Sequence, residues 1–516
     1  MFKARGAVII GRAIVFVLLI SGAAGNLTGC SDTFNIVTGS NSKNNVSGSN
    51  MAEKLAAYAV LGNYTVTEEE LQNDVLTALA SSKKNPEDAR SVSDITKNYK
   101  LISVTSEVYT VPESQKTTRS AIESYKDVNF YAYQFENAET EEKSYVLSCD
   151  DRRIGEIIAI ADGEFNPDDD APFIDILKTG LEAHVNLTID TWNNLTEEEV
   201  RSARSGAHDY IVDRNYYEVE KAFCKVDLDA FHRHIIVTQW GQDSPANDFV
   251  KICEGKDCLA GCVAVALAQI CYDRGYPEYC SPDVLSKLKM NNCVPFDWDG
   301  EYNYKSMKYV DHYEYTPKMQ SLEPEGKMNV AALMYDIGKG VNMNYGIGGS
   351  RSSGSTIESA YNWLEQNDFY CSPILDYDYS AIETSINNGH PVYISGKRKE
   401  RGPDGPIYYG HAWVIDDCGE YSCVINRIKT GEPFTITDNF VHCNWGWNGL
   451  HNGFYLSGLF NTSYGALFKI EDRYEHQSDG SWTQYPDQYK DGDEPDDGKH
   501  KYNYSYDLKI ISNICW

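Results

Sequence analysis

The stretch GCVAVALAQICYD, residues Gly261–Asp273, decides the fold of the region around it. Cys262 follows the leading glycine, and the residues after it are mostly apolar, so that a helix formed by them would be apolar around its whole circumference. This pattern predicts a helix that is enclosed by the rest of the protein instead of lying on its surface. Gly275 and Pro277 come directly after it. Gly accepts the left-handed conformation that ends a helix and Pro cannot continue one, so the helix is expected to stop there.

Cys262 is therefore expected at the first turn of a buried helix, where it is a candidate nucleophile. Unpaired amides and partial positive charge at a helix N-terminus favour a thiolate, and they lower a thiol pKa of about 8.5 to roughly 3.5–7.5 at such sites. Gly261 lets a substrate carbonyl approach the backbone closely. The alternative is a core cysteine, since free cysteines are among the most buried residues. A base and an orienting group further along the chain would favour the nucleophile.

Two later stretches supply these groups. GPIYYGHAWVIDDC, 405–418, has the β-branched and aromatic residues of a strand and places His411 between two small residues, about 150 residues after the cysteine. FVHCNWGWNGLHNGFYLSG, 440–458, places Asn444 beside Trp445 before a Gly-rich turn. An asparagine there can accept the imidazole Nδ1–H while the indole excludes water. The alternative is that the tryptophans are simply part of the core.

Composition narrows the classes of function. The 516 residues have room for several domains, and the net charge of -30 argues against nucleic acid as a partner. Four of the 14 cysteines, Cys253, Cys258, Cys262 and Cys271, lie close in sequence, but their spacing matches no familiar zinc motif. The Gly/Ser loop 341–355 lacks the Gly-Lys-Ser/Thr ending of a phosphate-binding loop. No metal or organic cofactor is expected.

The N-terminus has the pattern of an export signal. Lys3 and Arg5 precede an apolar run that is too short to span a bilayer, and Leu27-Thr28-Gly29-Cys30 resembles a bacterial lipobox. Residues 1–30 are expected to be a lipoprotein signal peptide with Cys30 as the lipidated residue, and 31–50 a flexible tether. The alternative is an ordinary signal peptide. In both cases the protein is exported, and the lipobox predicts a membrane anchor at the cell envelope or cell surface, with release of the mature protein left open.

Residues 51–228 have an α+β pattern without a catalytic set. Strands are expected at 129–135, 145–147 and 154–160, the last two separated by a charged corner at 150–153. A helix is expected over 173–184, and Thr196 with Glu199 forms a capping box for another.

Further strands are expected nearer the C-terminus. HPVYISG, 390–396, and the closing stretch 502–515 have strand composition, and Cys418 and Cys423 are predicted to flank a hairpin.

The four segments WGQDSPAN, GCVAVALAQI, YYGHAWVIDD and HCNWGWNG together resemble the streptopain family of bacterial cysteine peptidases. The resemblance covers roughly 230–516, and YVLSCDDRRIGEIIAIADG resembles the inhibitory prodomain of these enzymes. It implies an α+β fold in which a smaller α+β prodomain, 51–228, precedes a papain-like two-lobe catalytic domain, 229–516.

The same resemblance implies roles for single residues. It makes Cys262 the nucleophile, His411 the general base and acid, Asn444 the group that orients the imidazole, and Trp445 its shield. Gln242 falls on the glutamine that stabilises the oxyanion. Ala246 and Val265 depart from the usual family residues, and the first departure bears on the loop that carries Gln242.

The leading hypothesis is a cysteine endopeptidase made as a zymogen, with protein or peptide substrates and its own prodomain as intramolecular inhibitor. A second hypothesis is a thiol amidase or transglutaminase that acts on cell-wall peptides, with Asp416 orienting His411. The third is an inactive surface-binding lipoprotein that has kept the scaffold.

Overall fold

The structure is a computed structural model that describes residues 45–46, 51–62, 64–84, 90–111, 125–168, 172–207, 217–225, 236, 238–250, 258–275, 324–347, 351–402, 405–427, 433–460, 474–476, 482–484 and 507–515. The predicted signal peptide with Cys30, and all of the predicted tether except 45–46, lie outside the described residues.

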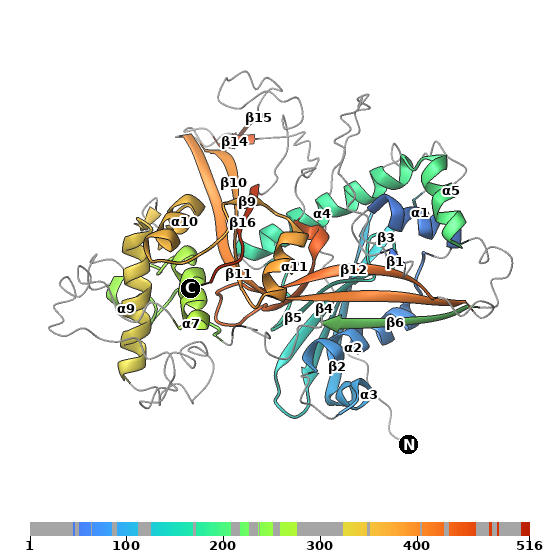
Figure 1. The fold of residues 1–516 in the computed structure, drawn as a ribbon, viewed down its shortest axis with the longest axis horizontal. Coiled ribbons are helices and arrows are strands. Elements are labelled where there is room, and N and C mark those ends of the chain that lie inside the picture. The colour runs from blue at the N-terminus through green and yellow to red at the C-terminus, as the bar shows by residue number, and fades with distance from the viewer. Residues whose placement is uncertain are drawn as a thin grey trace.

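The N-terminal part of the chain contains neighbouring antiparallel strands and several helices (Figure 1). Its elements are β1 (Asn45–Val46), α1 (Met51–Leu61), α2 (Glu68–Lys83), α3 (Val92–Ile95), the 3-10 helix η1 (Thr96–Asn98), β2 (Tyr99–Tyr109), β3 (Val128–Asn137), β4 (Lys143–Cys149), β5 (Ile157–Asp162), α4 (Pro172–Asn193), α5 (Glu197–Ala207) and β6 (Tyr217–Lys225).

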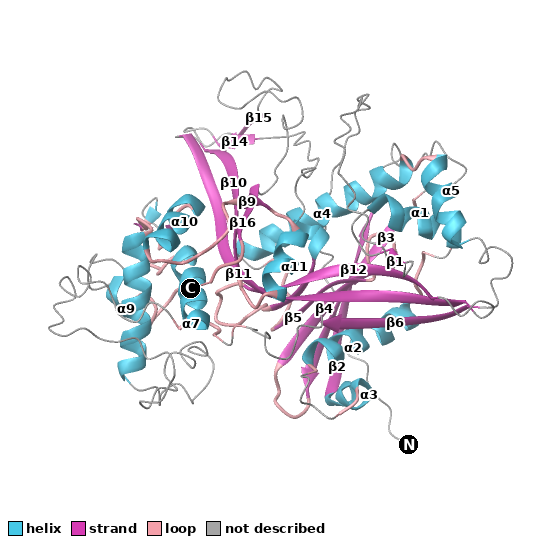
Figure 2. Cartoon of the chain, in the orientation of Figure 1, coloured by secondary structure: helices cyan, strands magenta, loops and turns pink. Residues whose placement is uncertain are grey.

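The C-terminal part brings a group of helices to one end of the molecule and long strands to its centre (Figures 1 and 2). Its elements are α7 (Cys262–Arg274), α9 (Pro324–Gly340), β7 (Asn344–Tyr345), β8 (Ser353–Gly354), α10 (Ile357–Gln366), β9 (Leu375–Asp376), α11 (Tyr379–Asn387), β10 (Val392–Gly402), β11 (Gly405–Arg427), β12 (Pro433–Asn444), β13 (Gly453–Leu456), the 3-10 helix η6 (Ser457–Phe460), β14 (Tyr474–His476), β15 (Trp482–Gln484) and β16 (Asp507–Ile511).

One sheet runs through both parts of the chain. Its strand order is β2-β3-β4-β5-β13-β12-β11-β10-β16-β9, so β5 and β13 join the two parts, antiparallel. The junction depends on a glycine, because a Cβ at Gly453 would lie 2.1 Å from the carbonyl oxygen of Ile160. A second junction forms where β6 pairs with the distal half of β11, next to the stretch that pairs with β10. The predicted mixture of helices and strands is confirmed.

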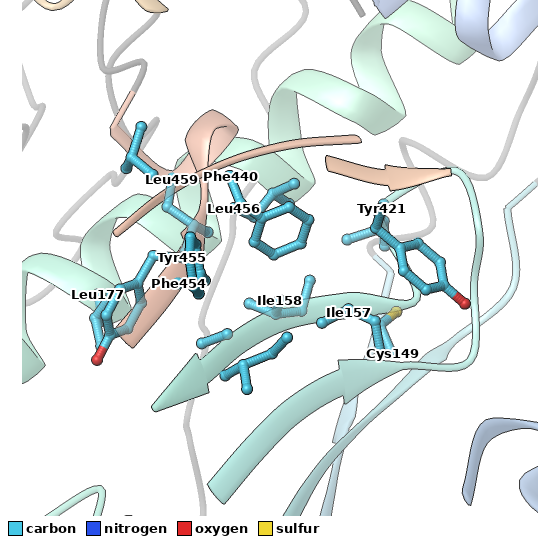
Figure 3. Close-up of a cluster of buried hydrophobic side chains, with 14 of the residues drawn as sticks. Cys149, Ile157, Ile158, Leu177, Tyr421, Phe440, Phe454, Tyr455, Leu456 and Leu459 are labelled. Carbon is cyan, nitrogen blue, oxygen red and sulfur yellow. The ribbon is translucent and has the colours of Figure 1, made fainter. Parts of the chain in front are cut away.

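The buried apolar side chains form two clusters. In the first, Ile158 of β5 and Leu177 of α4 pack with Phe440, Phe454 and Leu456 of the C-terminal strands, so the two parts of the chain share a core (Figure 3). The second cluster surrounds α7 and includes α9, α10 and one face of β11. Burial of apolar area contributes roughly 25 cal/mol per Å², which makes the shared cluster a main source of stability for the assembled chain.

Several local predictions are confirmed. Every residue from Val263 to Cys271 is buried, and Gly275 ends α7 in the left-handed conformation with φ 64°. Thr196 and Glu199 form the reciprocal capping box, with Thr196 Oγ1 accepting from the Glu199 amide at 3.2 Å and Glu199 Oε2 accepting from the Thr196 amide at 2.7 Å. The predicted strands correspond to β3, β4 and β5, and the helix over 173–184 extends to Asn193 as α4.

The hairpin predicted between Cys418 and Cys423 is wrong. Strand β11 continues through both residues to Arg427. Strand β12 pairs along one edge of this stretch and β6 along the other, and these hydrogen bonds keep the backbone extended.

In the charged corner at 150–153, Asp150 is half-buried and the other three residues are buried. Arg153 is 1% exposed, donates to Asp151 through Nε at 2.8 Å, and lies over the rings of Tyr125 at 3.5 Å and Trp192 at 4.6 Å. A guanidinium can be buried in this way because it is paired and stacked.

Candidate active site

Cys262 begins helix α7, as predicted. Gly261 before it has φ 96°, a conformation that favours glycine, and a Cβ there would come within 2.6 Å of Met343 Sδ. The thiol is partly buried and lies close enough to the backbone amide of Ala412 for that amide to influence its pKa. Ala412 follows His411 on β11, so the predicted nucleophile lies against the strand that carries the predicted base.

The expectation of a lowered pKa for Cys262 is wrong for this arrangement. Burial raises the pKa of the thiol above its usual value, and the amides of Ala412 and Val263 only partly offset this. The thiolate loses its water shell here, and the partial charges of amides are too weak to replace it. A protonated imidazole would supply a full charge, but the bond that the His411 ring makes here runs from Nε2 to the carbonyl oxygen of Trp445.

His411 is 3% exposed and stands in an aromatic cage. Its Nε2 donates to the carbonyl oxygen of Trp445 at 2.8 Å, and its ring stacks on Trp413, with a centroid distance of 6.0 Å, and on Trp445, at 6.1 Å. Trp447 meets the ring edge-on. Burial lowers the pKa of His411 to about 4, so the imidazole is neutral at physiological pH. The first turn of α7, with Cys262, thus lies beside the residue that follows His411 on β11. The thiol contacts the Ala412 amide, whereas the imidazole bonds the Trp445 carbonyl.

Asn444, at the end of β12, also has partners other than His411 in this arrangement. Its Nδ2 donates to the carbonyl oxygen of Thr238 at 2.6 Å, and its Oδ1 accepts from the Gly446 amide at 3.3 Å. The side chain is 1% exposed, so both of its polar atoms need partners inside the protein. Its predicted role of orienting the imidazole stays a prediction.

Gln242 is placed beside the start of α7. It is 8% exposed, and its carbonyl oxygen accepts from the Ala260 amide at 2.9 Å, two residues before Cys262. Asn247 Nδ2 donates to the carbonyl oxygen of Cys258 at 2.7 Å and closes the same loop. Ala246, the departure noted in the sequence, is buried. The backbone of Gln242 therefore lies near the start of α7, and its predicted role as an oxyanion donor stays a prediction.

Trp445 is fully buried, and its indole packs on Trp413 with a centroid distance of 4.7 Å. Sequence reasoning missed Trp413, although alternation along β11 places it on the same face as His411. It also missed Phe173 of α4, whose ring contacts Trp445 at 5.3 Å and His451 at 4.5 Å. No sequence signal could have revealed Phe173, because it reaches the site from nearly 90 residues before Cys262.

Asp416 bonds groups other than His411. Its Oδ1 pairs with His442 Nδ1 at 2.5 Å, and its Oδ2 accepts from the amide of Ile236 at 2.9 Å.

Within the ranges given above, which omit Cys253, no group of three or more His, Cys, Asp or Glu side chains is placed to hold a metal ion. Among the helices that the structure describes, none combines the length and apolar character needed to cross a bilayer.

Residues 240–455 match a profile of the Peptidase C10 family. Streptopain of Streptococcus pyogenes is 27% identical over 219 residues, which cover 40% of this chain and 48% of streptopain. The thiol protease/hemagglutinin PrtT of Porphyromonas gingivalis is 27% identical over 247 residues, 44% of this chain and 24% of that protein. The matched stretch spans about half the length of streptopain and a smaller share of PrtT.

Two solved structures from Prevotella intermedia are also similar. A prointerpain A fragment is 17% identical and covers 70% of this chain and 95% of its own, with a TM-score of 0.35. Active wild-type interpain A, a cysteine protease, is 18% identical and covers 56% of this chain and 100% of its own, with a TM-score of 0.29.

Proposed function

Because this chain belongs to the streptopain-type Peptidase C10 family of cysteine peptidases, we propose that it hydrolyses internal peptide bonds of proteins. One observation carries the assignment to particular residues: the thiol of Cys262, at the N-terminus of a buried helix, lies at the amide of Ala412, the residue after His411. Nucleophile and base are thereby presented by two facing elements, as nucleophilic catalysis requires.

The reaction begins when His411 turns from Trp445 toward Cys262 and takes the thiol proton. The thiolate attacks the carbonyl carbon of the scissile bond, and the developing oxyanion accepts from the Gln242 side-chain amide and the backbone N–H of Cys262. His411 then gives its proton to the leaving amine, and an acyl-enzyme remains. Water attacks the thioester with His411 again as base, which frees the thiol and a carboxylic acid. Asn444 orients the imidazole during these transfers, Trp445 shields it, and the scheme uses no metal or organic cofactor.

The finer architecture belongs to the same proposal. Helices α7, α9 and α10 form a helical lobe, and β10–β13 with β16 form the strand-rich lobe of a papain-like catalytic domain over 229–516. The two buried clusters support this division, because one surrounds α7 and the other lies beneath the far face of the long strands.

Residues 51–228 act as an inhibitory prodomain, so the full-length chain is latent. Two contacts support latency: the imidazole of His411 is bonded to the Trp445 carbonyl, and Phe173 of the N-terminal part packs on the indole of Trp445. Cleavage before the catalytic domain releases Phe173 and lets His411 reach Cys262. The test compares hydrolysis of a peptide by a chain of residues 51–516 and by a chain of residues 230–516, with and without added segment 51–228. Latency would be refuted if the two chains were equally fast and the added segment did not inhibit the shorter one.

Export and lipidation of Cys30 complete the proposal and rest on the sequence pattern alone. Labelled palmitate should be incorporated into the protein in its host and lost on Cys30→Ala. Label that persists in the variant would place the lipid elsewhere or identify it as contamination.

The central test compares two cysteines on one helix. Cys262→Ala should abolish hydrolysis of an unfolded protein by the proteolytically activated chain, because alanine cannot form the acyl-enzyme. Cys271→Ala, which is also buried on α7, should keep the activity. Hydrolysis by the Cys262 variant at the wild-type rate would reject the nucleophile. Cell-wall peptides in parallel test the amidase alternative, which no observation favours because Asp416 is bonded to His442 and Ile236.

A further inference from the structure

Asp416 is a buried carboxylate for which the proposed reaction has no role. It is the extra residue of a β-bulge, where the register between β11 and β12 shifts from Ile415/Cys443 to Asp417/His442. Its side chain is 0% exposed. Bulges next to active sites commonly re-aim a side chain, and a buried carboxylate is costly unless its oxygens are paired. The groups that bond the two carboxylate oxygens of Asp416 should therefore indicate what this residue does.

Those partners come from two other parts of the chain. Oδ1 pairs with Nδ1 of His442 on β12 at 2.5 Å, and the His442 ring packs edge-on against Phe454. Oδ2 accepts from the backbone amide of Ile236 at 2.9 Å, inside the protein. One carboxylate thus connects β11, β12 and the chain that leads into Gln242.

We call residues 236 and 238–242 the Gln242 segment. After the bond from Ile236, the Thr238 carbonyl accepts from Asn444 Nδ2 at 2.6 Å and the Trp240 carbonyl accepts from the Asn448 amide at 3.3 Å. The Gln242 carbonyl then accepts from Ala260. Every second residue of the segment, from Ile236 to Gln242, thus makes a hydrogen bond through its backbone. Of these four bonds, the one from Ile236 to Asp416 is the only one made with a charged side chain. Removing it would leave a buried amide without an acceptor at the start of the series.

We propose that Asp416, held by His442, is a positioning residue that fixes the Gln242 segment on the strands carrying His411 and Asn444, and so sets the place of the Gln242 side chain in the oxyanion hole. The proposal rests on the proposed function of Gln242. The side chain of Asp416 bonds His442 and the amide of Ile236, so we expect its effect on the reaction to pass through Gln242.

The test compares Asp416→Leu, which keeps the shape and removes the acceptor, with Asp416→Asn, whose carbonyl can still accept from Ile236. Asp417→Asn is the control, since Asp417 is the adjacent carboxylate and accepts from the amide of Cys418. In the full chain activated by limited proteolysis, the leucine variant should lose about tenfold in kcat on a peptide substrate. This is less than the 10²–10³ for complete loss of an oxyanion donor. KM should change by less than twofold, and Asp416→Asn and Asp417→Asn should stay within twofold of wild type.

Two readouts separate positioning from a general structural role. Alkylation of Cys262 by iodoacetamide forms no oxyanion, so it should proceed at the wild-type rate in Asp416→Leu. In a Gln242→Ala background, Asp416→Leu should cause no further fall in kcat, because residues that act through one group are not additive. A parallel fall in alkylation, or the same tenfold fall in both backgrounds, overturns the proposal and leaves the proposed function intact.

Amide hydrogen exchange makes the inference testable without activity. Peptides from the Gln242 segment should exchange faster in Asp416→Leu than in wild type, Asp416→Asn or Asp417→Asn. Unchanged exchange overturns the anchoring role even if the enzyme is active. If the activated wild type hydrolyses nothing, the proposed function fails, and the exchange result still decides whether Asp416 anchors the segment. If the leucine variant does not fold, Asp416→Ser, whose hydroxyl is one bond shorter, replaces it with the same expectations.

Discussion

The pH dependence of Cys262 alkylation should differ between the full-length and the activated chain. In the full-length chain, burial raises the pKa of the thiol above its usual value of about 8.5, and His411 is bonded to Trp445. At pH 5.5 the thiolate fraction is then below about 10⁻³, and it rises about tenfold per pH unit. A plot of log rate against pH should therefore have a slope near 1 from pH 5.5 to 8.

Activation should flatten this profile. Once His411 faces the thiol, the pKa of Cys262 should fall to near 4, the low value found for cysteines paired with histidine. The thiolate fraction at pH 5.5 is then close to 1, about 10³ times that in the full-length chain. A thiolate of lower pKa is also a weaker nucleophile: the logarithm of its rate constant falls by about 0.4–0.5 for each unit of thiol pKa. Over this change in pKa the weaker nucleophile offsets about 10² of the gain in thiolate fraction. The net increase is about tenfold at pH 5.5 and disappears near neutral pH. The slope is consequently a better measure than any single rate.

The assay is iodoacetamide labelling at several pH values, with site-resolved mass spectrometry of the peptide that contains both Cys262 and Cys271. Cys271 is the internal control, because it is fully buried and its pKa is raised in the same way by desolvation. It should stay unlabelled in both forms. A flat profile for Cys262 in the full-length chain would refute the reasoning, since it would require a thiolate that the described contacts do not stabilise.

Two further predictions concern the N-terminal part. Phe173→Ala should give the uncleaved chain measurable peptidase activity, because it removes the ring that packs on Trp445, at a cost to stability of about 3–5 kcal/mol. The control is Ile174→Ala, which removes a buried apolar side chain of similar value from the same helix and should leave the uncleaved chain inactive. If both variants were equally active, general unfolding would explain the activity. Glu182→Gln should raise the melting temperature at pH 8 and leave it unchanged at pH 4. Burial raises the pKa of Glu182 to about 8, so the folded state holds a proton that the unfolded state releases above about pH 4.5, and stability is lost as pH rises through that window. The gain is roughly 3 kcal/mol or less at pH 7, and a melting temperature that rises equally at both pH values would contradict it.

What the sequence predicted well is local. Helix α7 has an apolar run and a glycine stop within one window, and the capping box of Thr196 and Glu199 needs only four residues. Neither depends on distant parts of the chain, so periodicity and capping suffice. The candidate residues Cys262 and His411 were found because their neighbours carry a recognisable pattern.

What the sequence did not predict depends on contacts between segments that lie well apart in the chain. The straight course of β11 through Gly419 comes from pairing with β6 and β12, and Arg153 is buried because Tyr125 and Trp192 supply rings from elsewhere. The direction of the His411 side chain follows from its aromatic cage, and the raised pKa of Cys262 follows from its burial. Single-sequence patterns record none of these neighbours.

The sheet that crosses both parts of the chain has a consequence for handling the activated protein. Removal of the N-terminal part would uncover the edge of β13 where Ala159–Ala161 now pair, and, if β6 leaves with it, the edge of β11 from Gly419 to Arg427. Both would present unpaired backbone N–H and C=O groups beside apolar side chains, which is the usual template for strand-to-strand aggregation. The shortened chain should therefore be less soluble than its parent unless the cleaved fragment stays bound or a substrate strand takes its place.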